Sequence, residues 1–204
     1  MNKLSVSDII KNGIEIGLKN FIPLILATIL YVLTIWIPYL NVGTTIGMSM
    51  LPVEMAKGKT ISPTSIFDAK NRKYMGEFFI LMGLMMMAIY FGFAFLIIPG
   101  IVISIAFSLG IYLLIDKEVH PLKALSLSNK IMYDNKLSVF LSSFLFIISI
   151  YIIGIIFGFI SQYLAGFFMF LAIFLIIPIM QGMKAYIYKS LVLDNENWNK
   201  EDSN

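Results

Sequence analysis

The chain of 204 residues lacks cysteine and contains a single histidine, His120. The absence of cysteine excludes disulfides, thiolate metal sites and cysteine nucleophiles. His120 directly precedes Pro121 and has no other metal-ligating side-chain type nearby in the sequence. The sequence also shows no phosphate-binding glycine loop and no paired catalytic carboxylates. We therefore predict no catalytic residue, no metal site and no cofactor, and we expect a protein that is not an enzyme.

Charge is also scarce. Charged residues make up 13% of the chain and hydrophobic residues 59%, whereas about a quarter of a typical soluble domain is charged. Apolar stretches run from Phe21 almost to Leu193, which leaves no room for a large soluble domain. We predict one membrane domain, residues 1–193, followed by a polar tail, residues 194–204. The net charge of +3 comes from lysines that stand beside apolar spans, so we expect anionic lipid and not nucleic acid as the partner.

The length of the apolar stretches predicts membrane helices. A helix that crosses the hydrocarbon core needs about 20 apolar residues, because each adds about 1.5 Å across about 30 Å. Four stretches reach this length, at residues 21–40, 76–98, 137–160 and 165–188. Residues 101–115 form a shorter fifth span. Residues 41–55 are more polar, and we expect a short buried helix or a re-entrant segment there.

The placement of basic residues predicts the topology, because lysine and arginine concentrate in cytoplasmic loops. If all six segments cross or return, all 15 basic residues lie on the cytoplasmic side, and the outer turns near Asn41, Pro99 and Gln162 carry no charge. Lys184 is expected to reach the inner surface by extending along its helix. We predict that the following residues form a basic inner face: Lys57, Lys59, Lys70, Arg72, Lys73, Lys123, Lys130 and Lys136.

The predicted fold is therefore an all-α integral membrane protein with about six membrane segments, arranged as three helical hairpins. The charge pattern predicts that both termini are cytoplasmic. We expect the membrane to be a prokaryotic plasma membrane. Two polar stretches, residues 6–18 and 121–133, have apolar residues at helical spacing. We expect both to be amphipathic helices that lie in the plane of the inner interface.

Small residues at four-residue spacing predict close helix packing within the spans. The predicted packing positions are Gly43, Gly47, Gly100, Ser104, Ser108, Gly154 and Gly158. The Pro99-Gly100 pair is predicted to form a tight outer turn, because proline suits the first turn of a new helix. Polar residues in the short segment supply a candidate pathway through the membrane: Asn41, Thr44, Thr45, Ser49 and Glu54.

One stretch carries a resemblance to a known family. Ile97-Ile98-Pro99-Gly100 leads through a short span to Asp116, and Pro121, Ala124, Leu125 and Ser128 follow in a P-x-x-A-L-x-x-S pattern. This arrangement resembles uncharacterised prokaryotic membrane families related to the membrane domain of glycerophosphoryl diester phosphodiesterases. The resemblance implies a helical membrane module. It does not imply phosphodiesterase activity, because the acidic and histidine metal ligands of the separate catalytic domain have no counterpart here.

The sequence favours a lipid-associated scaffold or accessory subunit that acts through its inner amphipathic helices and binds anionic headgroups. Its partner would be another membrane protein or a second copy of the chain. The alternative is a small transporter or exporter component with a pathway between hairpins, which requires a polar cavity. An intramembrane enzyme would require clustered polar side chains at one depth, and the sequence shows no such cluster.

Overall fold

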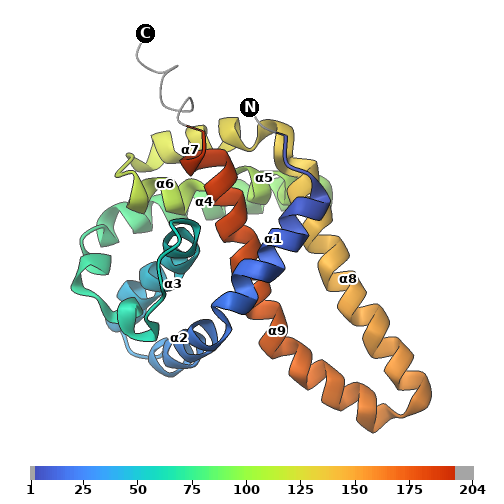
Figure 1. Cartoon of the computed structure of the whole chain (residues 1–204). Helices are drawn as coiled ribbons and strands as arrows, with labels where there is room; N and C mark the ends of the chain where they lie inside the picture. The colour runs from blue at the N-terminus through green and yellow to red at the C-terminus, as the bar shows by residue number, and fades with distance from the viewer. Residues whose placement is uncertain (1–2, 196–204) are drawn as a thin grey trace.

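The computed structural model describes residues 3–195. All regular secondary structure in this range is helical, and it contains no strand (Figure 1). The described range contains nine α-helices: α1 (Val6–Lys19), α2 (Phe21–Thr34), α3 (Leu40–Ala56), α4 (Met75–Phe95), α5 (Ile97–Ala106), α6 (Gly110–Asp116), α7 (Pro121–Ile131), α8 (Lys136–Ile160) and α9 (Gln162–Tyr188). Three short 3₁₀ segments, η1 (Pro63–Phe67), η2 (Ala69–Arg72) and η3 (Tyr133–Asn135), and a π turn, η4 (Lys189–Leu193), complete it. The all-α prediction is confirmed. The predicted tail lies outside the described residues, apart from residues 194 and 195.

Four helical stretches of the described chain are long and apolar enough to cross a membrane: 75–95, 97–116, 133–160 and 162–193. A fifth is possible by composition if α1 and α2 count together, although these two helices bend by 76° between Lys19 and Phe21. Only 17% of the most apolar window is buried in three of the four stretches. Burying so many apolar side chains requires lipid or another protein, since soluble monomers rarely expose such a surface.

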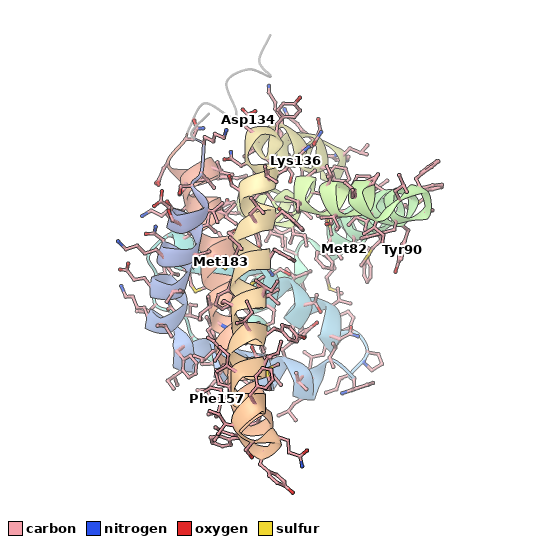
Figure 2. The ribbon with its side chains drawn as sticks, turned by 90° about the vertical axis from the view of Figure 1, so that its right-hand side faces the viewer. Met82, Tyr90, Asp134, Lys136, Phe157 and Met183 are labelled. Atoms are coloured by element: carbon pink, nitrogen blue, oxygen red, sulfur yellow. The ribbon has the colours of Figure 1, made fainter. Side chains whose placement is uncertain are left out.

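The helices pair as hairpins, but the hairpins are not parallel. α4 packs along α5, α8 packs along α9, and α2 contacts α3. The α4–α5 hairpin extends sideways from the upper part of the α8–α9 hairpin, and Met82 and Tyr90 lie well away from α8 (Figure 2). The polar residues Asp134 and Lys136 lie at one end of α8, whereas Phe157 lies near the far end (Figure 2). The two apolar hairpins therefore project from a common body in different directions.

The second predicted segment, residues 41–55, forms α3, where we expected a short buried helix or a re-entrant segment. α3 has 17 residues, of which nine are buried. The polar segment that follows α3 folds back along its side. The approach is so close that a Cβ at Gly47 would lie 2.6 Å from the Ile66 Cα and 2.7 Å from the Asn71 side-chain nitrogen. Arg72 lies over the ring of Tyr39, with 5.6 Å between the guanidinium carbon and the ring centroid. Residues on opposite sides of a hydrocarbon core about 30 Å thick do not meet in this way. α3 is therefore a short buried helix, which is the first of the two alternatives expected for residues 41–55.

The connection between α4 and α5 lies at Leu96, whose backbone is extended (φ −161°, ψ 157°). The Pro99-Gly100 pair, predicted as the outer turn itself, lies inside the first turns of α5. This correction has a physical reason: proline lacks an N–H, and the first turn of a helix leaves its N–H groups without intrahelical partners. Proline is therefore tolerated just after the turn as well as in it.

The predicted span at residues 101–115 is broken between α5 and α6. At this break the Ser128 side chain of α7 takes the place of helical hydrogen bonds. Its hydroxyl donates to the Ala106 carbonyl at 2.6 Å and accepts from the Leu109 amide at 3.1 Å. Ser128 is fully buried. α7 is therefore anchored to the break, and Ala124 and Leu125 are also buried. The expected position of α7 in the plane of the inner interface stays a prediction.

α1 also packs against another helix, along one of its sides. It crosses α9 in an X (Figure 1), and this is the most extensive helix contact in the described chain. Three glycines form the crossing point. A Cβ built at Gly17 would lie 2.5 Å from the Pro178 carbonyl oxygen, and one built at Gly182 would lie 2.6 Å from the Gly17 amide nitrogen. Gly13 lies against Met183. One side of α1 therefore holds α9, and its expected position in the plane of the inner interface stays a prediction.

Candidate functional site

A cavity of about 530 Å³ opens between α3, the α5–α6 break, α8 and α9. Ligand pockets in proteins commonly fall between about 300 and 1,000 Å³, so this one has the size of a binding site. We call it the hydroxyl-lined cavity, after its polar residues Thr45, Ser49, Ser104, Ser108 and Ser143; Lys184 is the one charged residue of its lining. The rest of the lining consists of methionine and aliphatic side chains together with Gln181, Tyr31 and Tyr112.

Helical spacing and a break in the chain bring the hydroxyls together. Thr45 and Ser49 are one turn apart on α3, and Ser108 lies in the α5–α6 break, one turn after Ser104. Ser49, Ser104 and Ser108 each donate a hydrogen bond to a carbonyl of their own helix or turn, at 2.7 to 2.9 Å. A hydroxyl that donates in this way keeps an oxygen lone pair free to accept. The cavity wall therefore offers acceptors to a ligand that brings its own hydroxyl donors.

Lys184 gives the cavity its charge. It lies on α9, one turn before Tyr188, and its side chain is exposed to the cavity. Within residues 3–195, Lys184 forms no ion pair. The prediction that it extends to the inner surface is not tested by these contacts, but they leave the ammonium group without a protein carboxylate. A charge near apolar surroundings is costly unless an opposite charge meets it.

A second polar cluster joins three helix ends next to the cavity. The Asp116 carboxylate ends α6, is 5% exposed, and forms an ion pair with Lys57 after the end of α3. The Tyr188 hydroxyl of α9 donates to the same carboxylate at 2.6 Å. The Tyr188 ring packs edge-on against Tyr112, which lines the cavity, with 5.5 Å between the centroids. This Asp116 cluster holds the walls of the cavity together.

The structure separates the residues of the candidate polar pathway. Thr45 and Ser49 line the hydroxyl-lined cavity, whereas Glu54 lines a different cavity and pairs with Lys59 at 2.8 Å. Thr44 is fully buried, and its hydroxyl donates to the carbonyls of Leu40 and Asn41. The Asn41 amide donates to the Ile35 carbonyl at 3.2 Å and holds the α2–α3 connection. These five residues therefore do not line one continuous path.

Most of the predicted basic inner face is paired within the protein. Lys57 pairs with Asp116, Lys59 with Glu54, Lys70 with Asp68, and Lys73 with Glu118. Arg72 covers Tyr39, and Lys136 donates to Asn129 and lies over Tyr133. Lys123 and Lys130 also have interaction partners. Surface lysines with partners of their own are weaker candidates for lipid binding than the sequence suggests.

Two of these exposed pairs perturb pKa values. The Tyr74 hydroxyl and the Lys73 ammonium both donate to the Glu118 carboxylate. These contacts lower the pKa of Glu118 below its usual value of 4.5. The Lys73 pKa is raised, chiefly by the neighbouring Tyr74 and Glu118, and the Lys59 pKa is raised by its hydrogen bond to Glu54. Hydrogen bonds and opposite charge favour the ionised forms of Glu118, Lys73 and Lys59.

The predicted packing glycines have different neighbours. Gly100 of α5 lies against the Phe93 ring of α4, and Gly154 of α8 lies against Met169 of α9. Each of these glycines therefore allows the two helices of its own hairpin to pack closely. Gly43 and Gly47 face η1 and η2 instead of another membrane helix. A Cβ at Gly158 would be in ordinary contact with Ala165, at 3.9 Å. Ser104 and Ser108 face the cavity.

Sequence reasoning missed the tightest crossing and the charged cavity residue. Gly13 and Gly17 have the same four-residue spacing that marked the other packing positions, so the crossing was accessible from that signal. Lys184 and Ser143 had no such signal, because no motif or spacing in their apolar stretches distinguishes them. Their role depends on side chains from α3 and the α5–α6 break, which are distant in sequence.

Comparison with known proteins finds no matching family model, no similar curated protein and no similar solved structure. The resemblance carried by Pro121, Ala124, Leu125 and Ser128 therefore stays a prediction. What the fold supports is the class: an all-α chain with four or five candidate membrane spans, and thus a possible polytopic membrane protein.

Proposed function

We propose that this chain is a non-enzymatic, lipid-associated membrane protein that holds one anionic amphiphile in the hydroxyl-lined cavity. The α4–α5 and α8–α9 hairpins are embedded in the bilayer in this proposal. Each hairpin returns the chain to the side from which it started, so both ends of the described chain face the same compartment. The exposed apolar side chains of both hairpins support this placement.

The single observation that carries the proposal is the Lys184 ammonium, which forms no ion pair within residues 3–195 and is the one charged group of the cavity lining. A bound anion would supply the opposite charge that this ammonium lacks beside the apolar part of the lining. The apolar part of the lining suits a hydrocarbon chain, and the serine and threonine oxygens suit hydroxyl donors on the head of the ligand. An amphiphile with one negative charge and a polyol head, such as phosphatidylglycerol, combines these three features.

Thermal unfolding of the detergent-purified protein tests the proposal. Short-chain phosphatidylglycerol should stabilise the wild-type protein more than phosphatidylcholine of the same chain length, because only the former has a net charge. Lys184→Gln should remove this difference, since one charge-assisted contact is worth about 1.5–3 kcal/mol, or roughly tenfold or more in affinity. Lys184→Arg should retain most of it.

Lys11→Gln provides the matched control, because Lys11 is exposed on α1 and lines none of the described cavities. It removes the same charge and should leave the lipid preference unchanged. Equal stabilisation by the two lipids in the wild-type protein would count against the proposal. So would a preference that survives Lys184→Gln.

The cavity also bears on the transporter alternative, which required a polar cavity. Its lining includes Thr45 and Ser49 but not Glu54, so the site supports binding more directly than passage. Release of phosphatidylglycerol to the opposite leaflet of proteoliposomes, dependent on Lys184, would favour transport. Binding without such transfer is the outcome that we expect.

A further inference from the structure

A second cavity, of about 520 Å³, lies where the end of α1, the start of α2, the end of α3 and the start of η4 meet. Four lysines from distant parts of the sequence line it: Lys19, Lys57, Lys59 and Lys189. The only acidic residue of its lining is Glu15. We call it the four-lysine cavity. It shares no lining residue with the hydroxyl-lined cavity.

The fold itself brings these lysines together. The 76° bend between α1 and α2 places Lys19 at the corner where an amphipathic helix gives way to an apolar one. The Asn20 side chain holds this corner by donating to the Ile16 carbonyl at 2.9 Å. Gly58 ends α3 with a φ of +72°, which glycine adopts without strain, and turns Lys57 and Lys59 toward the corner.

The charges of this cavity are only partly neutralised by the protein. Lys57 pairs with Asp116 and Lys59 pairs with Glu54. Lys19 and Lys189 form no ion pair in the part of the chain that the structure describes, and both are exposed. Lys19 and Lys189 therefore leave positive charge at this cavity that no ion pair of the described chain neutralises, and an anion that enters it would do so.

The rest of the lining indicates the kind of anion. Ile16, Pro23, Met55 and Ile61 supply an apolar side, and the Asn20 amide and the Thr60 hydroxyl supply neutral polar groups. Lysine binds phosphate as a flexible point charge. A free phosphate ion would leave the apolar side in contact with water, whereas the glycerol and first methylene groups of a lipid would cover it.

We propose that the four-lysine cavity binds the phosphate headgroup of an anionic phospholipid. This site is distinct from the hydroxyl-lined cavity and does not depend on the function proposed for it. Its recognition is mainly electrostatic, so it accepts a headgroup without hydroxyl groups, such as that of phosphatidic acid. Its affinity falls as the salt concentration rises, because exposed charges are screened.

The test is carried out on the full chain with Lys184→Gln in every sample, so that the hydroxyl-lined cavity cannot contribute a charge. Binding of short-chain phosphatidic acid is measured by titration in a neutral detergent. Lys19→Gln combined with Lys189→Gln should weaken this binding by about tenfold or more, because two charge-assisted contacts are lost. Lys19→Arg with Lys189→Arg should bind nearly as well as the unmodified cavity.

The matched control combines Lys3→Gln with Lys11→Gln, which removes two charges from residues that do not line the cavity. If this control weakens binding as much as Lys19→Gln with Lys189→Gln, the net charge of the protein is responsible and the proposed site is wrong. Inorganic phosphate is titrated as the second probe. Equal affinity for inorganic phosphate would overturn the assignment to a lipid headgroup, whereas weaker binding of phosphate would support it. Circular dichroism on each variant confirms that the helices are retained.

Discussion

The crossing of α1 and α9 makes a sharp prediction about Gly182. A Cβ at this position would lie 2.6 Å from the amide nitrogen of Gly17 and closer still to the carbonyl oxygen of Gly13. Ordinary contacts begin near 3.4 Å, and both neighbours are backbone atoms, so no side-chain rotation relieves the overlap. Gly182→Ala therefore forces the two helices apart by about 1 Å.

The magnitude follows from two opposing effects. Overpacking a tight contact costs typically about 1–3 kcal/mol, while replacing glycine by alanine in a helix contributes up to about 1 kcal/mol of stability. We expect a net loss of about 1–2 kcal/mol, together with a weaker hold of α1 on the body. Gly17→Ala should behave similarly, because its Cβ would meet the backbone of Pro178 and Ile179.

Unfolding in mixed detergent micelles, followed by circular dichroism, measures the effect. Gly83→Ala and Gly166→Ala are matched controls, because a Cβ at either helical position meets nothing within 4 Å. Both controls should be neutral or slightly stabilising. If Gly182→Ala is as stable as these controls, the close crossing of α1 and α9 does not exist as described.

Three further predictions concern polar contacts. Ser128→Ala removes the side chain that bridges the Ala106 carbonyl and the Leu109 amide, and the two unsatisfied groups should lower the free energy of unfolding by about 1–3 kcal/mol; Ser126→Ala, at an exposed position on the same helix, is the control. Tyr188→Phe removes the hydrogen bond to Asp116 and should cost about 1.5–3 kcal/mol, which the same unfolding assay measures. The low pKa of Glu118 predicts a contribution to stability that is complete above the usual value of 4.5 and is lost as the pH falls through the lower, folded-state pKa. Stability measured between pH 3 and pH 6 should therefore depend less on pH in Glu118→Gln than in the wild-type protein.

The sequence predicted three of the four long helices correctly because their signal is local, whereas the predicted span at residues 21–40 is the 14-residue α2. A stretch of about 20 apolar residues has few alternatives to a helix, since its backbone must satisfy its own hydrogen bonds. α4, α8 and α9 therefore begin and end within a few residues of the predicted segments. The break between α5 and α6 was not predictable in this way, because it depends on Ser128, which comes from another helix.

The partners of the basic residues were not predictable from the sequence, because an ion pair can join residues that are far apart along the chain. In the structure, Lys57 meets Asp116, and Lys73 meets Glu118, partners that are 59 and 45 residues away. The contact of Arg72 with Tyr39 likewise depends on how η2 folds back along α3. Hydropathy and loop charge contain no information about such pairs.

The candidate site was predicted in part. Thr45 and Ser49 were candidate pathway residues, and Ser104 and Ser108 were predicted for packing; all four line one cavity. What the sequence could not provide is the convergence of α3, the α5–α6 break and α9 on Lys184. A lysine near the end of a span is ordinary by itself, and its meaning comes from the absence of a carboxylate partner within the described chain.

The central claim is that the cavity beside Lys184 holds an anionic amphiphile, and photo-crosslinking tests it most directly. A phosphatidylglycerol analogue with a photoreactive group in its head is irradiated with the purified protein, and the labelled peptides are identified by mass spectrometry. The account predicts labels between residues 104 and 112 and between residues 180 and 187, which are lost in Lys184→Gln. Labels found only on the hairpin tips, for example at residues 93–98 or 159–164, and unchanged by that substitution would contradict it.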